Sequence, residues 1–150
     1  MALFSVSGID ELNAAFGRIG NVPWDVTEEV LGAMAEVAAA KVRAQGEAMG
    51  VRDPESNVHI LDKIKPVEAK KTDGGGSQDI TFSGSRTRIN NRTGKKTRTR
   101  NAEIAFVNEF GKKNQPARPF VRDGMDRNVD AITDPGIKIL GDWIEKEFQG

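Results

Sequence analysis

Residues 25–49 read DVTEEVLGAMAEVAAAKVRAQGEAM and carry the strongest secondary-structure signal of the chain. Asp25 is suited to cap a helix, and Glu28 three residues later completes the capping-box pattern. Gly50 is suited to end the helix. The sequence therefore predicts a long helix from Asp25 to Met49 that organises the core. Its apolar residues lie near one face, and its alanines let other elements approach closely: Val26, Val30, Met34, Val37, Ala44; Ala33, Ala35, Ala38, Ala39, Ala40.

Two shorter elements are predicted before this helix. Leu3–Val6 has the apolar residues of a short strand. Ser7 is a suitable N-cap for an amphipathic helix over Gly8–Ile19, which Gly20 ends. The apolar residues of that helix recur at helical spacing: Ile9, Leu12, Phe16, Ile19.

The centre of the chain predicts strands. Val58–Ala69 is rich in apolar and β-branched residues, and Pro66 makes it an edge strand because proline cannot donate to a ladder. Asp73–Ser77 has the composition of a hairpin loop. Asp79–Ser83 and Ala102–Phe110 are predicted as further strands, since their apolar residues alternate.

The segment Ser85–Asn101 is basic and contains no acidic residue. Ile89 is its only large apolar side chain, so the segment has little surface to bury. We expect an exposed, flexible arm at a hairpin tip that orders only on assembly, against an acidic groove of a neighbour or against DNA; a solvated loop with no role is the alternative. Its basic residues are Arg86, Arg88, Arg92, Lys95, Lys96, Arg98 and Arg100.

The C-terminal part predicts a helix in two pieces. Gln115–Pro119 is a stiff linker, and Pro119 suits the first turn of a helix. Asp134–Gly136 is expected to interrupt that helix, with Asp134 capping the second piece. One face of the second piece is apolar: Ile137, Leu140, Ile144, Phe148.

These elements predict an α+β fold in a single domain over residues 1–150. A small antiparallel sheet packs against the long N-terminal helix and a kinked or split C-terminal helix, and the basic hairpin arm extends from the sheet. The side chains expected to be largely buried are Phe106, Phe120, Trp143, Val30 and Met34.

Composition excludes several classes of protein. The 22 basic and 22 acidic residues balance, so net charge gives no indication of a nucleic-acid or membrane partner. The absence of cysteine excludes disulfides and cysteine-based zinc sites. We find no signal-peptide pattern and no apolar run of about 20 residues that could span a bilayer. A soluble protein that stays in the cell that makes it is expected.

No motif argues for an enzyme. Gly94-Lys95-Lys96-Thr97 partly resembles a phosphate-binding loop, but the earlier glycine and the Ser or Thr directly after the lysine are missing. Glu68-Ala69-Lys70, with Asp62 upstream, matches the residue types of metal-dependent nucleases, although a solvated edge strand is favoured. His59 is the only histidine and has no cysteine to complete a metal site. We therefore expect a non-enzyme without metal or cofactor.

The C-terminal half carries a more specific signature. Residues 106–111 read FVNEFG and residues 115–122 read QPARPFVR. This pattern resembles the tail-component family of lambdoid long-tailed bacteriophages, the tail-completion or head–tail joining proteins. The N-terminal half agrees in layout, with VSGIDEL at residues 6–12, the long helix, and LDKI at residues 61–64. The chain differs from the family pattern at Lys112-Lys113, where Thr or Ser is expected, and in its longer basic arm.

The resemblance implies a structural virion subunit, assembled in the host cytoplasm, that completes the tail or joins it to the head at the neck or upper tail. It implies a homo-oligomeric ring, with six subunits expected, and a monomer in isolation. The expected partners are head-closure, tail-terminator or tail-tube proteins. The alternative is a non-specific nucleic-acid-binding module that uses the arm, because Arg and Lys without interleaved aromatic residues suit backbone contact.

The expected contact residues are the seven basic residues of the arm together with Lys112, Lys113 and Arg118. A second set is expected to be structural. Gly111 allows a sharp turn or a positive φ after Phe110. Pro116 and Pro119 stiffen the crossing to the helix, Phe120 fills the core, and Glu109 pairs with a Lys or Arg across the sheet.

Overall fold

The computed structural model describes residue 17 and residues 20–52, 59–73 and 75–150. The predictions for Leu3–Val6 and Gly8–Ile19 lie outside the described residues, except at Gly17. The remainder is an α+β fold, as predicted.

The long helix α2 (Trp24–Ala48) is the central element, and its predicted bounds are confirmed to within a residue at each end. Its N-cap is Pro23, not Asp25, which instead lies in the first turn, where a carboxylate is favoured by the helix dipole. Beyond its C-terminal end Gly50 adopts φ 69°, and Val51 donates a hydrogen bond back to the Gly46 carbonyl.

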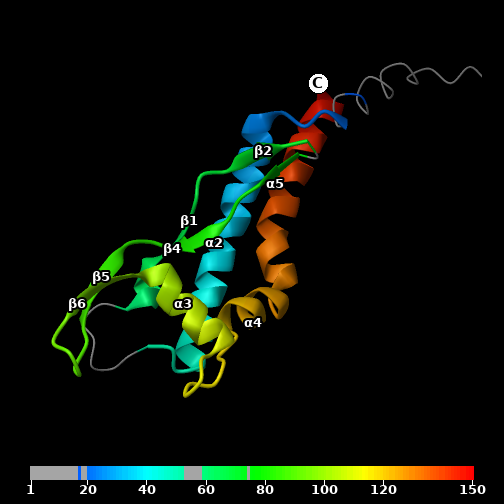
Figure 1. The fold of residues 1–150 in the computed structure, drawn as a ribbon. Coiled ribbons are helices and arrows are strands. Elements are labelled where there is room, and N and C mark those ends of the chain that lie inside the picture. Colours follow the sequence, from blue (N-terminus) through cyan, green and yellow to red (C-terminus); the bar gives the residue numbers. More distant parts are fainter. Residues whose placement is uncertain (1–16, 18–19, 53–58, 74) are drawn as a thin grey trace, which may run out of the picture.

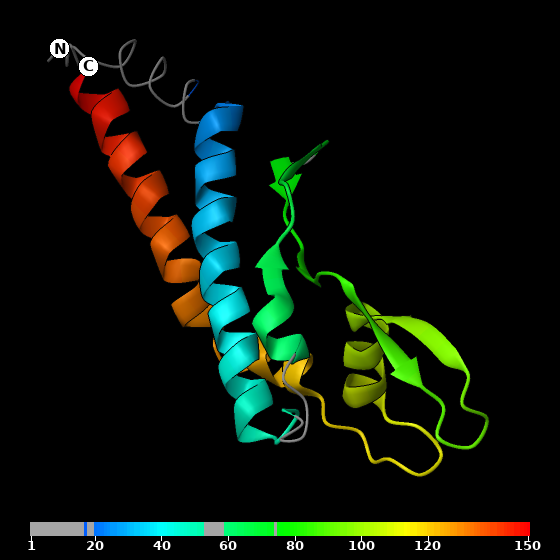
Figure 2. The ribbon, with the colours of Figure 1, turned by 90° about the vertical axis from the view of Figure 1, so that its left-hand side faces the viewer.

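Three layers are visible around α2. Helix α5 (Val129–Gln149) runs antiparallel to α2 on one side, and the strands and α3 (Asn101–Phe110) lie on the other (Figures 1 and 2). Small residues allow the helices to approach closely. A Cβ on Gly136 of α5 would lie 2.6 Å from the Met34 sulfur, and one on Gly124 would lie 2.9 Å from the Val42 Cα. Of the alanines expected to allow close approach, Ala35, Ala38 and Ala39 are buried, whereas the closest approaches of α4 (Phe120–Asp126) and α5 are made by their own glycines.

The described strands form three two-stranded antiparallel ribbons rather than one sheet. These pair β1 (Ile64–Pro66) with β4 (Ile80–Phe82), β2 (Lys70–Thr72) with β3 (Gly75–Ser77), and β5 (Ser85–Ile89) with β6 (Lys96–Arg100). The strand predicted at Asp79–Ser83 is confirmed. The edge strand predicted over Val58–Ala69 is confirmed only at β1, because Ile60–Lys63 form a 3₁₀ helix, η1. The hairpin loop is shorter than the predicted Asp73–Ser77, because Gly75–Ser77 pair with β2 as β3.

The strand predicted over Ala102–Phe110 is wrong, because this segment is α3. Its buried residues Asn101, Ile104, Ala105 and Asn108 recur at helical spacing, and the alternation around Phe106 is coincidental. Only Ile104 and Val107 in the segment are β-branched. The prediction that Phe106 is buried is consequently also wrong, since 62% of its surface is exposed.

The C-terminal helix is split, as predicted, but at a different place. Helix α4 (Phe120–Asp126) ends at Arg127–Asn128, and α5 continues through Pro135. The interruption expected at Asp134–Gly136 is therefore wrong. Proline in a helix interior costs about 3 kcal/mol, yet α5 continues through Pro135, next to the point where Gly136 packs closely on Met34 of α2.

The core lies where α2, α4, η1 and α3 meet. Phe120 is fully buried, and its ring meets that of Phe82 edge-on with centroids 5.7 Å apart. The predicted burial of Phe120 is confirmed, whereas Val30, Met34 and Trp143 are only half-buried. The buried residues around Phe120 include Val42, Val51, Ile60, Leu61, Ile64 and Ile104.

Candidate interaction site at the base of the basic arm

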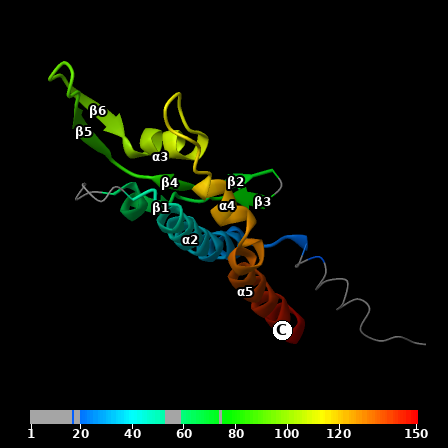
Figure 3. The ribbon, with the colours of Figure 1, turned by 90° about the horizontal axis from the view of Figure 1, so that it is seen from below.

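The basic arm is an antiparallel hairpin, β5–β6, that projects beside α3 from the end of the molecule at which α2 ends (Figures 1 and 3). Its five paired positions run from Ser85↔Arg100 to Ile89↔Lys96. At the tip, the Asn90 side chain accepts hydrogen bonds from the amides of Arg92 and Thr93. The predicted exposed hairpin is thus confirmed, and its flexibility in the free subunit stays a prediction.

Strand geometry divides the cations of the arm between two faces. Paired residues of an antiparallel ribbon point to the same side, and neighbours along a strand point to opposite sides. Arg86 and Arg88 therefore share one face with Thr97 and Thr99, their partners. The opposite face carries Lys96, Arg98 and Arg100. We call these the inner and the outer face, because the inner one faces α3. Arg92 and Lys95 lie at the tip.

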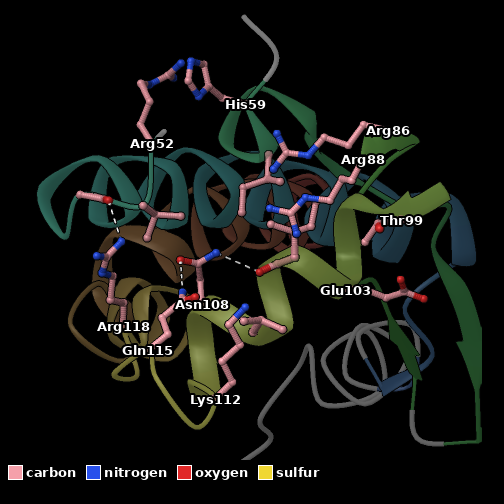
Figure 4. Close-up of a pocket in the computed structure, with 15 residues that line it drawn as sticks. Arg52, His59, Arg86, Arg88, Thr99, Glu103, Asn108, Lys112, Gln115 and Arg118 are labelled. Atoms are coloured by element: carbon pink, nitrogen blue, oxygen red, sulfur yellow. Dashed lines mark hydrogen bonds between the residues drawn. The ribbon is translucent and has the colours of Figure 1, made fainter. Parts of the chain in front are cut away.

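A cavity of about 580 Å³ lies between the inner face, α3, residues 50–52 after α2, and residues 59–60 at the start of η1 (Figure 4). The arm contributes Arg86, Arg88 and Thr99 to its wall. The other polar lining side chains come from elements far apart in the sequence: Arg52, His59, Glu103, Asn108, Lys112, Gln115, Arg118. Among the described residues, five Arg and Lys side chains and one carboxylate line the cavity. This excess of positive charge suits an anionic ligand.

The charge of Arg52 in this wall is compensated by two carboxylates, those of Glu47 and Asp62. Its guanidinium donates to both oxygens of Glu47 at 2.7 and 3.0 Å and to Asp62 at 2.9 Å. These hydrogen bonds hold the pKa of the Glu47 and Asp62 carboxyls below their ordinary values and raise the pKa of Arg52. Arg52 therefore positions the start of the cavity wall and neutralises Asp62.

Arg118 has a structural contact as well as a place on the cavity wall. Its guanidinium donates to the Gly50 carbonyl at 2.9 Å, and its amide donates to the Asn108 carbonyl at 2.6 Å. These bonds tie the linker to the end of α2 and to α3. Lys112 lines the cavity, whereas its neighbour Lys113 is exposed and does not line it.

The residues of the family-like signature hold α3 against α4. The carboxylate of Glu109 accepts hydrogen bonds from the amides of Val121 at 2.8 Å and Arg122 at 3.1 Å, and so caps the first turn of α4. The predicted pairing of Glu109 with a Lys or Arg across the sheet is wrong, because α3 is a helix whose end faces the start of α4.

The predicted turn at Gly111 is confirmed. Gly111 adopts φ 77°, and a Cβ there would lie 2.8 Å from the Ala117 nitrogen and the Gln115 oxygen. Pro119 is the N-cap of α4, one residue earlier than the helical position predicted for it, and Pro116 is exposed in the linker.

One surface feature escaped the sequence analysis. Phe106 and Phe110 are 62% and 66% exposed and contact each other on the solvent-exposed side of α3, with ring centroids 4.6 Å apart. Helical spacing at i and i+4 could have revealed this pair, had the segment been recognised as a helix.

The residues considered for metal chemistry do not form a cluster. Within the described ranges, no group of three or more His, Asp or Glu side chains is placed to hold a metal ion. Asp62 is held by Arg52, and Glu68 is exposed. His59 lies in the cavity wall.

Across residues 20–52, 59–73 and 75–150, none of the helices is both long and apolar enough to cross a bilayer. Comparison of the chain with protein-family models, curated proteins and solved structures gave no match.

Proposed function

We propose that this chain is a structural subunit of a tailed-bacteriophage virion, which completes the tail or joins it to the head and acts in a homo-oligomeric ring. The residues that resemble the tail-completion family support the proposal because they lie together at the junction of α3 and α4. Glu109 caps α4, Gly111 makes the turn, and Phe120 fills the core. The likeness therefore lies in residues that determine the fold.

Assembly into a ring is supported by the distribution of charge, because basic and acidic side chains gather at opposite ends of a molecule whose net charge is zero. The basic arm lies at one end. At the other end, where α2 begins and α5 finishes, five exposed carboxylates outnumber Lys146 and the two exposed lysines of β2, Lys70 and Lys71, whose hairpin packs on Trp24: Asp25, Glu28, Glu29, Asp142, Glu145 (Figure 2). Opposite charges on different surfaces favour heterologous contacts between copies, and such contacts close into rings when the rotation allows.

Electron microscopy of phage particles made without this protein tests the proposal. We expect full heads and separate tails, because the joint between them is missing. A plasmid copy of the gene should restore joined particles. Normal joined particles in its absence would refute the proposed function.

The arm itself is tested by shortening it at the tip. Replacing residues 89–96 with an Asn-Gly turn keeps Arg88 opposite Thr97 and removes Lys95 and Lys96 with the tip. The shortened protein should fold but fail to restore joined particles. Full restoration would show that the tip has no part in assembly.

A second function, non-specific DNA binding, is favoured by the outer face of the arm. Lys96, Arg98 and Arg100 occupy alternate positions there, and no carboxylate lies between Ser85 and Asn101. Arg100 is paired with Glu103, at 3.1 Å, which leaves Lys96 and Arg98 as the main phosphate contacts. Binding of duplex DNA should weaken steeply with salt. Salt-independent binding, or none at low salt, would exclude this function.

A further inference from the structure

The cavity beside α3 combines an apolar floor with a cationic wall. Val51, Ile60 and Ile104 are each at most 8% exposed and form the floor, together with the half-buried Val107. The volume of about 580 Å³ lies within the usual range for ligand sites. Among the described residues, no Phe or Trp side chain lines it, and the imidazole of His59 lies in the wall. The floor thus suits an aliphatic side chain rather than a stacked base.

Several cations of the wall can bind an anion. The side chains of Arg88 and Lys112 have no hydrogen-bond or ion-pair partner among the residues that the structure describes. The hydrogen bond from Arg118 to the Gly50 carbonyl uses one of the five guanidinium N–H groups. The carboxylate in the wall, Glu103, is already paired with Arg100. The uncompensated charge is therefore positive.

We propose that this cavity binds an acidic peptide segment of a partner protein, with an aliphatic side chain on the floor and flanking carboxylates at Arg88, Lys112 and Arg118. Duplex DNA offers phosphates along a line and no aliphatic side chain to cover Val51 and Ile104, so it matches the outer face of the arm and not the cavity. The proposal goes beyond the proposed function and does not depend on it.

The test uses the full chain and a fluorescein-labelled peptide, Glu-Glu-Leu-Leu-Glu-Glu with blocked ends, in fluorescence anisotropy. The inner variant R88S/K112S and the outer variant K96S/R98S remove equal charge from neighbouring surfaces. Because charge-assisted hydrogen bonds to the cavity are lost, the inner variant should bind the peptide at least about tenfold more weakly. The outer variant should stay within about threefold of the wild type.

Two controls separate the cavity from diffuse charge. A peptide with serine in place of both leucines should bind more weakly to the wild type, because it leaves the floor uncovered. The single variant Lys112→Glu repeats the test without a change in the arm and should also lose binding. Thermal melting confirms that each variant is folded.

Equal losses in the inner and outer variants would overturn the proposal, since they would indicate binding by general charge. So would equal affinity for the leucine and serine peptides. Duplex DNA that binds the wild type and loses affinity only in R88S/K112S would assign the cavity to nucleic acid instead.

Discussion

Phe120 is the side chain on which the junction of α2, α4 and η1 depends. It is fully buried, and it contacts Phe82 edge-on. Gly46 of α2 makes room for it, since a Cβ there would lie 3.1 Å from the Phe120 ring and 2.5 Å from the Leu61 side chain. Phe120→Ala therefore opens a cavity between elements that cannot easily collapse.

The expected loss of stability follows from this burial. Truncation of a buried Phe costs about 3–5 kcal/mol in all, and the loss of an aromatic pair, worth about 0.5–1.5 kcal/mol, places Phe120 in the upper part of that range. We expect Phe120→Ala to lower the free energy of unfolding by about 4–5 kcal/mol. At about 3 °C per kcal/mol for a chain of this size, the melting temperature should fall by roughly 12–15 °C. Urea unfolding followed by circular dichroism measures the free energy directly.

Phe106→Ala is the matched control, because it makes the same chemical change at a side chain that is 62% exposed. It should cost about 1 kcal/mol or less, through its contact with Phe110. A cost for Phe120→Ala below about 1 kcal/mol, or similar costs for the two variants, would contradict this account of the core.

Four further predictions concern α4, the turn before it, the Arg52 cluster and the arm. Glu109→Ala should destabilise the fold by about 1 kcal/mol through the loss of the α4 cap, and Glu109→Gln by less, in urea titrations; equal costs would argue against capping. Gly111→Ala should cost more than about 1 kcal/mol, because φ is positive and backbone atoms occupy the space of the new Cβ; an unchanged melting temperature would contradict this. Arg52→Ala should return the pKa of Asp62 upward to near its ordinary 3.8 in an NMR titration. Because the fold depresses the pKa of Asp62, its interaction with Arg52 stabilises the fold above about pH 4, and this stabilisation is lost as the pH falls through the folded-state pKa. The free energy of unfolding of Arg52→Ala should therefore fall less than that of the wild type as the pH is lowered through this range. Amide hydrogen exchange in the isolated subunit should be fastest across residues 85–101, and protection equal to that of α2 would refute the predicted mobility.

The elements with long, local sequence signals were predictable before the structure was known. Residues 25–49 have helical spacing and no proline, so α2 was predicted almost to the residue. The arm was predicted because seven cations around a single large apolar residue cannot form a core. Gly111 and Phe120 were also recognised from the sequence, one by its backbone freedom and the other by its size.

Features that depend on contacts between distant segments were not predictable from local sequence patterns. Residues 101–110 are compatible with a strand by alternation, and they become a helix because its buried face packs on η1 and α4. Pro135 indicates a helix break in the sequence, but α5 continues through it in the fold, beside the contact of Gly136 with Met34. The cavity is assembled from the end of α2, η1, α3, the linker and the arm. Its lining spans residues 50–118, and no local pattern encodes a surface made by five separate segments, because the contacts exist only after the chain has folded.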